Sequence, residues 1–286
     1  MQLVAYGAQD IYLTGNPQIT FFKVVYRRHT NFAVESIEQT FNGQADFGKR
    51  VTATISRNGD LIQQMYLEVI TPIIGTTAGP LWTYGVGNAL VKQAEIEIGG
   101  QLIDRQYGDW MNIWTELTTP EGKRRGYDNM VGNLAKSAVQ TGNLDSTKTK
   151  RLYVPLQFWF NRNPGLALPL IALQYHEVKL NLELRNSADL IQQTQTITAG
   201  EVLSCKLYVD YIYLDTDERR RFAQVSHEYL IEQVQFTGAE SIETLASNKN
   251  VTLNFNHPVK ELIWSHLASS NNTARRWFNY SGDKDD

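Results

Sequence analysis

The sequence has little of what several classes of protein depend on. Cys205 is the only cysteine among 286 residues, so the chain forms no internal disulfide, which suits a reducing compartment. No apolar run reaches the roughly 18 residues that a membrane-spanning helix needs. The opening stretch, MQLVAYGAQD, lacks the basic n-region and the apolar h-region of a secretory signal. We therefore expect a soluble protein that is made in the cytosol.

Charge is also scarce. Charged residues make up 20% of the chain and the net charge is -3, which is not the basic footprint that nucleic-acid-binding proteins usually carry. Short basic runs start at Arg27, Lys123 and Arg219, and solvated turns or loops explain them more simply than phosphate contacts do. We predict no direct nucleic-acid partner.

Residues that could carry chemistry are few and scattered. His176-Glu177 and His227-Glu228 lack the second histidine, four residues on, of a zinc-protease helix. Cys205 falls within a predicted strand, where a small buried hydrophobe is a simpler interpretation than a nucleophile. We predict no enzyme, with no catalytic, cofactor-binding or metal residues and no cofactor. Two alternatives stay open: a metal site from His29, His176, His227, His257 and His266, or convergent carboxylates from Asp104, Asp109 and Glu116.

What the sequence does have is the period-two alternation of β-strands and many aromatic residues, with 14 Tyr, 11 Phe and 6 Trp. The stretch VKLNLELR alternates strictly and predicts a strand with four core-facing side chains, Val178, Leu180, Leu182 and Leu184. The stretch Glu201–Asp215 has apolar residues on both faces, so we expect it to lie between layers or at an interface.

Two dipeptides predict tight hairpins, Asn58-Gly59 and Gly99-Gly100. A two-residue loop at the second would pair Ile98 with Gln101 and Ile96 with Ile103, which places two isoleucines opposite one another on the core face.

Helical patterning is sparse. Asp109–Leu117 predicts a short helix and Tyr127–Val139 a turn or two more, within an otherwise irregular loop, Thr118–Lys150, whose length is typical of functional loops. Phe158-Trp159-Phe160 is expected to end a strand before a tight corner at Asn163-Pro164-Gly165.

A charged stretch, Asp215–His227, predicts a boundary, after which strand patterns restart at Tyr229–Phe236 and Asn250–Trp264. The whole chain is predicted to be all-β.

Five stretches, taken together and in order, resemble one family: GAQDIYLTGNPQITFFKVVYRRHTNF, ISRNGDLI, NPGLALPLIALQYHEVKL, HEYLIEQVQFTG and LNFNHPVKELIW. The chain is similar to the major capsid proteins of large eukaryotic double-stranded DNA viruses, of the phycodnavirus and iridovirus type. The resemblance covers about Gln2 to Trp264.

The resemblance implies a viral double jelly roll, in which two eight-stranded β-sandwiches stand side by side. It implies an N-terminal arm at 1-23, a complete first jelly-roll capsid domain at 24-220 and the start of a second, incomplete one at 225-286. The implied function is that of a major capsid subunit whose pseudo-hexagonal homotrimers tile an icosahedral virion shell. Implied partners are neighbouring capsomers, minor capsid proteins and inner viral membrane proteins, with assembly in the host cytoplasm.

Only about 60 residues follow the boundary, whereas the family's second jelly roll is as large as its first. We therefore expect a fragment, a partial gene product or a truncated capsid paralogue. Residues 225–286 are expected to be mobile or aggregation-prone, with proteolysis starting after about Asp215.

The stretch Gly7–Phe32 is expected to be an arm whose aromatic residues contact the base of the barrel or a neighbouring subunit, through Phe21, Phe22, Val24 and Tyr26. A first strand of the same sheet is the alternative. The stretches Ile73–Asn88 and Thr118–Lys150 are expected to be tower or rim loops. A second function stays open, a minor capsid, spike or glycan-binding module in which Trp110 and Trp114 stack on sugars.

Overall fold

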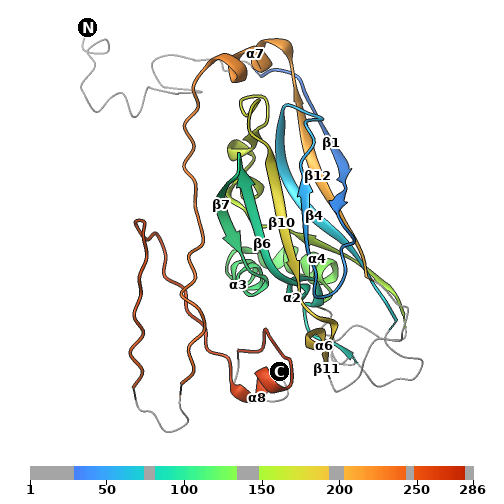
Figure 1. Cartoon of the computed structure of the whole chain (residues 1–286), viewed down its shortest axis with the longest axis vertical. Helices are drawn as coiled ribbons and strands as arrows, with labels where there is room; N and C mark the ends of the chain where they lie inside the picture. The colour runs from blue at the N-terminus through green and yellow to red at the C-terminus, as the bar shows by residue number, and fades with distance from the viewer. Residues whose placement is uncertain (1–28, 74–80, 134–147, 193–202, 243–247, 281–286) are drawn as a thin grey trace.

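Eight strands of five or more residues form two facing sheets in a computed structural model that describes residues 29–73, 81–133, 148–192, 203–242 and 248–280 (Figure 1). Their order is β1 (Phe32–Gln39), β3 (Arg50–Thr54), β4 (Leu61–Thr71), β6 (Val91–Ile98), β7 (Gln101–Gln106), β8 (Lys150–Pro155), β10 (Val178–Leu184) and β12 (Ser204–Leu214). The predicted arm, Phe21 to Tyr26 included, lies outside the described residues.

The strands are distributed between the sheets as in a jelly roll. One sheet has the order β1-β12-β4-β8, and the other has the order β2-β3-β10-β6-β7, where β2 is Phe41–Asn42. Shorter strands are β9 (Leu168–Pro169), which pairs with β4, and β5 (Leu81–Trp82), which pairs with β11 (Ile191–Gln192). All described strand pairs are antiparallel, and the chain repeatedly crosses from one sheet to the other. The predicted all-β jelly roll is confirmed.

Apolar side chains from both sheets fill the space between them. The strand VKLNLEL of β10 turns Val178, Leu180, Leu182 and Leu184 inward, and each is at most 2% exposed. Leu67, Val154 and Leu207 of the facing sheet belong to the same cluster and are completely buried. The core positions predicted for this strand are therefore confirmed.

One predicted hairpin is wrong. The strands β3 and β4 on either side of Asn58-Gly59 belong to opposite sheets, so the chain crosses the barrel end here instead of turning back on itself. The backbone N–H of Asp60 donates to Ile212 at 3.0 Å, which attaches this crossing to β12. Gly59 lies so close to Tyr211 that a Cβ there would approach the Tyr211 side chain to 3.0 Å.

The turn predicted at Gly99-Gly100 is confirmed, but the strand pairing predicted beyond that turn is wrong. Gly99 and Gly100 have φ values of 60° and 83°, which suit a two-residue primed turn, and Ile98 pairs with Gln101 as predicted. A bulge then shifts the register, so that Ile96 lies opposite Asp104 and not opposite Ile103. As a result an aspartate occupies a buried position on β7.

The two longest described helices lie between β7 and β8. Helix α3 (Gly108–Thr118) confirms the helix predicted at Asp109–Leu117, whereas α4 (Glu121–Val131) lies mostly in the stretch predicted to be irregular. Pro120 precedes α4, and Gly132 ends it with a φ of 78°. The predicted strand end at Phe158–Phe160 is instead the start of the short helix α5 (Trp159–Arg162), followed by a 3-10 turn, Pro164–Leu166. Two further short helices are α2 (Val86–Leu90) and α6 (Ser187–Leu190).

Strand β12 is shorter than predicted and has one buried face. Leu207, Val209 and Tyr211 point into the core, while Lys206 on the opposite face is exposed and Tyr208 is half-buried. The described residues form no second layer over this outer face, so the interface that the pattern predicted stays a prediction.

The chain after β12 contains no strand within 225–242 and 248–280. The boundary stretch forms helix α7 (Thr216–Gln224), and α8 (Ser269–Thr273) follows much later. The strands predicted at Tyr229–Phe236 and Asn250–Trp264 are wrong, because these two extended runs face one another without a backbone ladder. Side chains join them: Gln235 accepts from the backbone N–H of Asn256 at 3.0 Å, and Glu232 pairs with Lys260.

We predict that Leu182→Ala lowers the free energy of unfolding by about 2–5 kcal/mol, because it opens a cavity at a completely buried position. Urea unfolding followed by tryptophan fluorescence measures the change. The matched control is Lys179→Ala on the outer face of the same strand, which should change the unfolding free energy by less than about 1 kcal/mol. An equal effect of both variants would contradict the register.

Candidate functional site

Groups suited to catalysis do not come together in the described parts of the chain. No three His, Cys, Asp or Glu side chains there are close enough to hold a metal ion. His176, His257 and His266 are exposed at separate places, and His227 contacts Phe222. None of the described helices is long and apolar enough to cross a membrane.

The three candidate carboxylates have separate partners. Asp109 accepts from Arg185 at 3.1 Å, and Glu116 pairs with Arg124. Asp104 is buried on β7, away from both. Burial raises the pKa of the Cys205 thiol to about 12, so the thiol is neutral and packs against the core.

Asp104 is the polar centre of a docking site for the chain that follows the barrel. Its Oδ1 accepts the backbone N–H groups of Arg105 at 2.9 Å and Val234 at 3.0 Å, and its Oδ2 accepts Gln106 Nε2 at 3.0 Å. Burial raises the pKa of the Asp104 carboxyl, while these hydrogen bonds and the charge of Arg162 oppose the shift. The bulge of β7 thus places an acceptor where Val234 needs one.

Arg162 forms the second contact of this docking site. Its guanidinium lies 4.1 Å from the ring centroid of Trp114, and its Nη1 is 3.4 Å from a carboxylate oxygen of Glu232. Its Nε donates to the carbonyl of Gln157 at 2.9 Å. Burial lowers the pKa of Arg162, and the nearby carboxylates of Glu232 and Asp104 oppose that shift.

Further contacts make Tyr229–Phe236 a docked segment. The Tyr229 hydroxyl donates to the carbonyl of Ala167 at 3.2 Å, Gln233 Nε2 donates to the carbonyl of Ile103, and the rings of Phe236 and Tyr107 lie 5.1 Å apart. Figure 1 shows the chain descending from α7 beside β7. The segment therefore lies along the edge of the second sheet.

A second anchor lies farther along the chain, next to α6. Arg275 Nη1 donates to the carbonyl of Ile191 at 2.7 Å, and its own carbonyl accepts the Thr83 hydroxyl at 2.6 Å. Trp277 Nε1 donates to the carbonyl of Asp189 at 2.8 Å, while Arg185 stacks on the Trp277 ring at 4.7 Å. Contacts at both places hold the downstream chain against the barrel.

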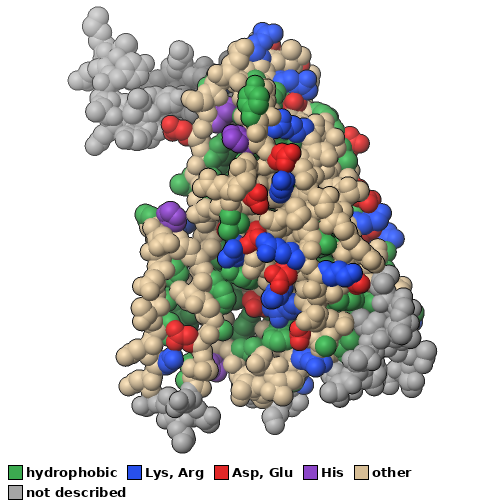
Figure 2. Space-filling view, viewed as in Figure 1, with side chains coloured by type: hydrophobic (Ala, Val, Ile, Leu, Met, Phe, Trp, Pro, Cys, Tyr) green, Lys and Arg blue, Asp and Glu red, His purple; other side chains and the backbone are tan. Residues whose placement is uncertain are grey.

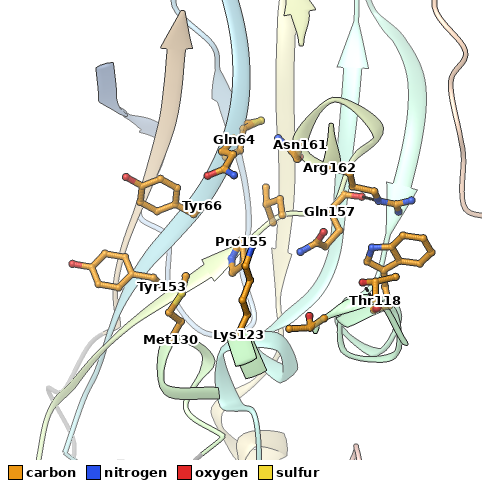
Figure 3. Close-up of a pocket in the computed structure, with 14 residues that line it drawn as sticks. Gln64, Tyr66, Thr118, Lys123, Met130, Tyr153, Pro155, Gln157, Asn161 and Arg162 are labelled. Carbon is orange, nitrogen blue, oxygen red and sulfur yellow. Dashed lines mark hydrogen bonds between the residues drawn. The ribbon is translucent and has the colours of Figure 1, made fainter. Parts of the chain in front are cut away.

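A cavity of about 870 Å³ opens between β4, β8, α3 and α4 (Figure 3). Tyr66, Tyr153, Gln157 and Lys123 are among its lining residues. Trp110 and Trp114 lie on helix α3 and not in a loop as expected, and their stacked rings are 5.7 Å apart. The Trp114 ring contacts both Trp110 and Arg162, and it lines the cavity.

Two family descriptions match the chain. "Major capsid protein N-terminus" matches residues 20–215, and "Large eukaryotic DNA virus major capsid protein" matches residues 218–285. The chain belongs to the major capsid proteins of large eukaryotic DNA viruses. The family resemblance of the sequence is thus confirmed.

Individual capsid relatives agree. The chain is 63% identical to the major capsid protein of Pyramimonas orientalis virus over 94% of this chain and 65% of that protein. It is 56% identical to that of Phaeocystis pouchetii virus, over 92% of this chain and 57% of the relative. The chain therefore spans roughly three fifths of the length of these curated relatives.

Solved capsid structures have the same fold. A chain of the PBCV-1 virus capsid is 46% identical, with a TM-score of 0.69 over 84% of this chain and 57% of that one. The Faustovirus major capsid protein, at 13% identity, has a TM-score of 0.50 over 76% of this chain and 60% of that one, which shows the likeness of fold alone. The double jelly roll is the fold of these capsid proteins.

We predict that Asp104→Ala releases the docked segment, because the N–H of Val234 loses its acceptor. A hydrogen bond to a charged group contributes about 1.5–3 kcal/mol, so amide exchange in 229–236 should accelerate roughly tenfold to a hundredfold. Hydrogen–deuterium exchange with mass spectrometry measures it. The control is Asp109→Ala, which removes a carboxylate outside the docking site and should leave amide exchange in 229–236 as it is in the unmodified chain. If Asp104→Ala also left this exchange unaltered, Asp104 would not hold the docked segment.

We also predict that Asp104→Asn keeps the segment docked and does not lower stability at pH 7. The pKa of Asp104 is raised in the folded state, so its ionisation costs stability as the pH rises through that pKa. The neutral amide removes this cost and keeps an oxygen acceptor. The gain in unfolding free energy of Asp104→Asn over the unmodified chain should shrink as the pH falls through the folded-state pKa of Asp104. Urea titrations at several pH values would measure this gain. A gain that grows at low pH would contradict the raised pKa of Asp104.

Proposed function

We propose that the chain is a structural subunit of an icosahedral virus capsid and that it acts through shape and burial, without catalysis. The observation that carries the proposal is the match to a PBCV-1 capsid chain, at 46% identity and a TM-score of 0.69. The curated relatives at 63% and 56% identity are named major capsid proteins, which supports the same role.

The geometry suits a rigid structural unit. Two sheets with a filled interior resist deformation, because well-packed cores have low compressibility. The helices α3 and α4 lie outside the sheets, in the connection between β7 and β8, and Met111 of α3 packs into the core.

The proposal extends to the assembly. Copies associate as homotrimers of pseudo-hexagonal outline, which contact neighbouring capsomers, minor capsid proteins and inner viral membrane proteins in a virion assembled in the host cytoplasm. Residues 1-23 form an arm, 24-220 the first capsid domain, and 225-286 the start of a second jelly roll.

Exposed apolar side chains after the boundary support the last point. Leu230, Phe236 and Trp264 are 80%, 59% and 82% exposed, and extended runs that expose such residues need a partner sheet to bury them. Other strands of the same polypeptide would supply that sheet.

We predict that the complete protein self-associates at micromolar concentration into a closed homotrimer. Multi-angle light scattering measures the mass, and a glycan array tests the alternative. A stable monomer that binds a defined glycan would contradict the capsid role. A trimer without glycan binding supports it.

A further inference from the structure

Charges on the outer face of the sheet β3-β10-β6-β7 occur in pairs of opposite sign. Arg50 and Arg105 both contact Glu95, at 2.7 Å and 2.6 Å, and Lys92 contacts Glu183 at 2.6 Å. Figure 2 shows basic and acidic side chains side by side over the part of the barrel that bears β6, β7 and β10. Because these charges balance one another, this face has no strong preference for an ion of either sign.

The cavity between β4, β8, α3 and α4 has a different charge. Lys123 and Arg162 are the only charged side chains among the described residues that line it, and no carboxylate is among them. They come from α4 and α5, on different sides of the cavity (Figure 3). The fold thus brings two cations that are distant in sequence into one hollow. A concave surface of one charge sign concentrates ions of the opposite sign, so this cavity favours an anion.

The Arg162 guanidinium is mostly buried and keeps donors for a ligand. Its side chain is 16% exposed, and its Nε donates to the carbonyl of Gln157 at 2.9 Å. Its Nη1 lies 3.4 Å from Glu232, which is long for a hydrogen bond between charged groups. Its Nη2 has no hydrogen-bond partner within the described residues. Since a guanidinium binds a carboxylate or phosphate best through two parallel N–H groups, Arg162 suits an oxyanion.

Other lining groups suit the organic part of such a ligand. Lys123 is exposed and forms no ion pair with the described residues. The side-chain amides of Gln64 and Gln157 also have no hydrogen bond to that part of the chain. The rings of Tyr66 and Tyr153 add flat apolar surface. The cavity volume of about 870 Å³ lies within the range of roughly 300–1,000 Å³ that is typical of small-molecule sites.

We propose that this cavity binds a small organic anion, whose phosphate or carboxylate group contacts Arg162 and whose organic part lies against the tyrosine rings. Lys123 adds a second positive charge. The inference goes beyond the structural role of a capsid subunit, and it does not depend on the association of copies.

Arg162 also links the cavity to the docked segment Tyr229–Phe236. Glu232 of that segment lies next to Nη1, so its carboxylate and the oxyanion of a ligand compete for the same guanidinium. Glu232 has a second partner in Lys260, which keeps it paired when Arg162 turns to a ligand. Removing the charge of Glu232 should therefore strengthen anion binding, whereas damage to the fold would weaken it.

The test is isothermal titration calorimetry of the whole chain at low salt with two probes, phenyl phosphate and benzoate. They carry the same ring and differ in the anionic group, so the tighter of the two assigns the ligand as a phosphate or as a carboxylate. Benzyl alcohol, which is neutral, should bind at least about tenfold more weakly than the tighter probe. If neither anion binds, or if benzyl alcohol binds equally well, the proposed site is wrong.

Three variants locate the binding. Arg162→Gln should raise the dissociation constant of the tighter probe about tenfold or more, because it removes a charged donor. Lys123→Gln should raise it about threefold, as expected for an exposed charge. Glu232→Gln should lower it about threefold, because the internal competitor is gone. Circular dichroism checks that each variant is folded.

The matched control is Arg125→Gln, which removes a positive charge from the same helix as Lys123 but does not line the cavity. It should leave the dissociation constant unchanged. Because Lys123 is exposed, Lys123→Gln remains informative even if Arg162→Gln disturbs the fold. Weaker binding in Glu232→Gln, or equal effects of Lys123→Gln and Arg125→Gln, would overturn the proposed site.

Discussion

The burial of apolar side chains between two sheets is the constraint on which the rest of the structure depends. Leu180 and Leu182 of β10 pack in one cluster with Leu67 and Leu207 of the other sheet, and all four are completely buried. Each large apolar side chain removed from water contributes about 1.5–3 kcal/mol. Because the chain crosses between the sheets again and again, this one cluster also fixes the positions of the crossings and of both outer faces.

Other polypeptide segments contact this barrel at the edge strands of its sheets. The edge strand β7 is covered by the docked segment Tyr229–Phe236, through the carboxylate of Asp104. The edge strand β1 pairs with β12 alone among the described residues. An uncovered edge is a template for association, so natural proteins cover it or place charge on it. Here the β7 edge is covered from within the chain, and the β1 edge carries Glu35 and Glu38, which bond to Tyr213 and Lys206 of β12.

Local patterns predicted much of the fold. The alternation of β10 and the glycines at Gly99-Gly100 are local signals, since side-chain direction and turn geometry depend on adjacent residues. The resemblance to capsid proteins supplied the jelly-roll order. The crossing at Asn58-Gly59 was mistaken for a hairpin because a dipeptide does not reveal that its flanking strands enter different sheets. The bulge in β7 was missed for a similar reason, since an added residue is recognised only against its partner strand.

The docking site was harder to predict. Asp104 was considered only as a member of a carboxylate pair, whereas its partner is a backbone N–H 130 residues later in the chain. No local pattern encodes that contact. Trp114 was expected to be available to a ligand, and only the folded chain brings Arg162 over its ring.

The central claim is that the sandwich between Phe32 and Leu214 is a cooperative unit, to which the downstream chain is attached at two places. Hydrogen–deuterium exchange of the whole chain, resolved by peptide, tests it most directly. The account predicts that peptides from β4, β6, β10 and β12 exchange slowest and together, because opening any of them exposes the shared core. Peptides from 237–242 and 248–268 should exchange fastest, since these residues have no backbone ladder. Protection of 248–268 equal to that of β10 would contradict the account.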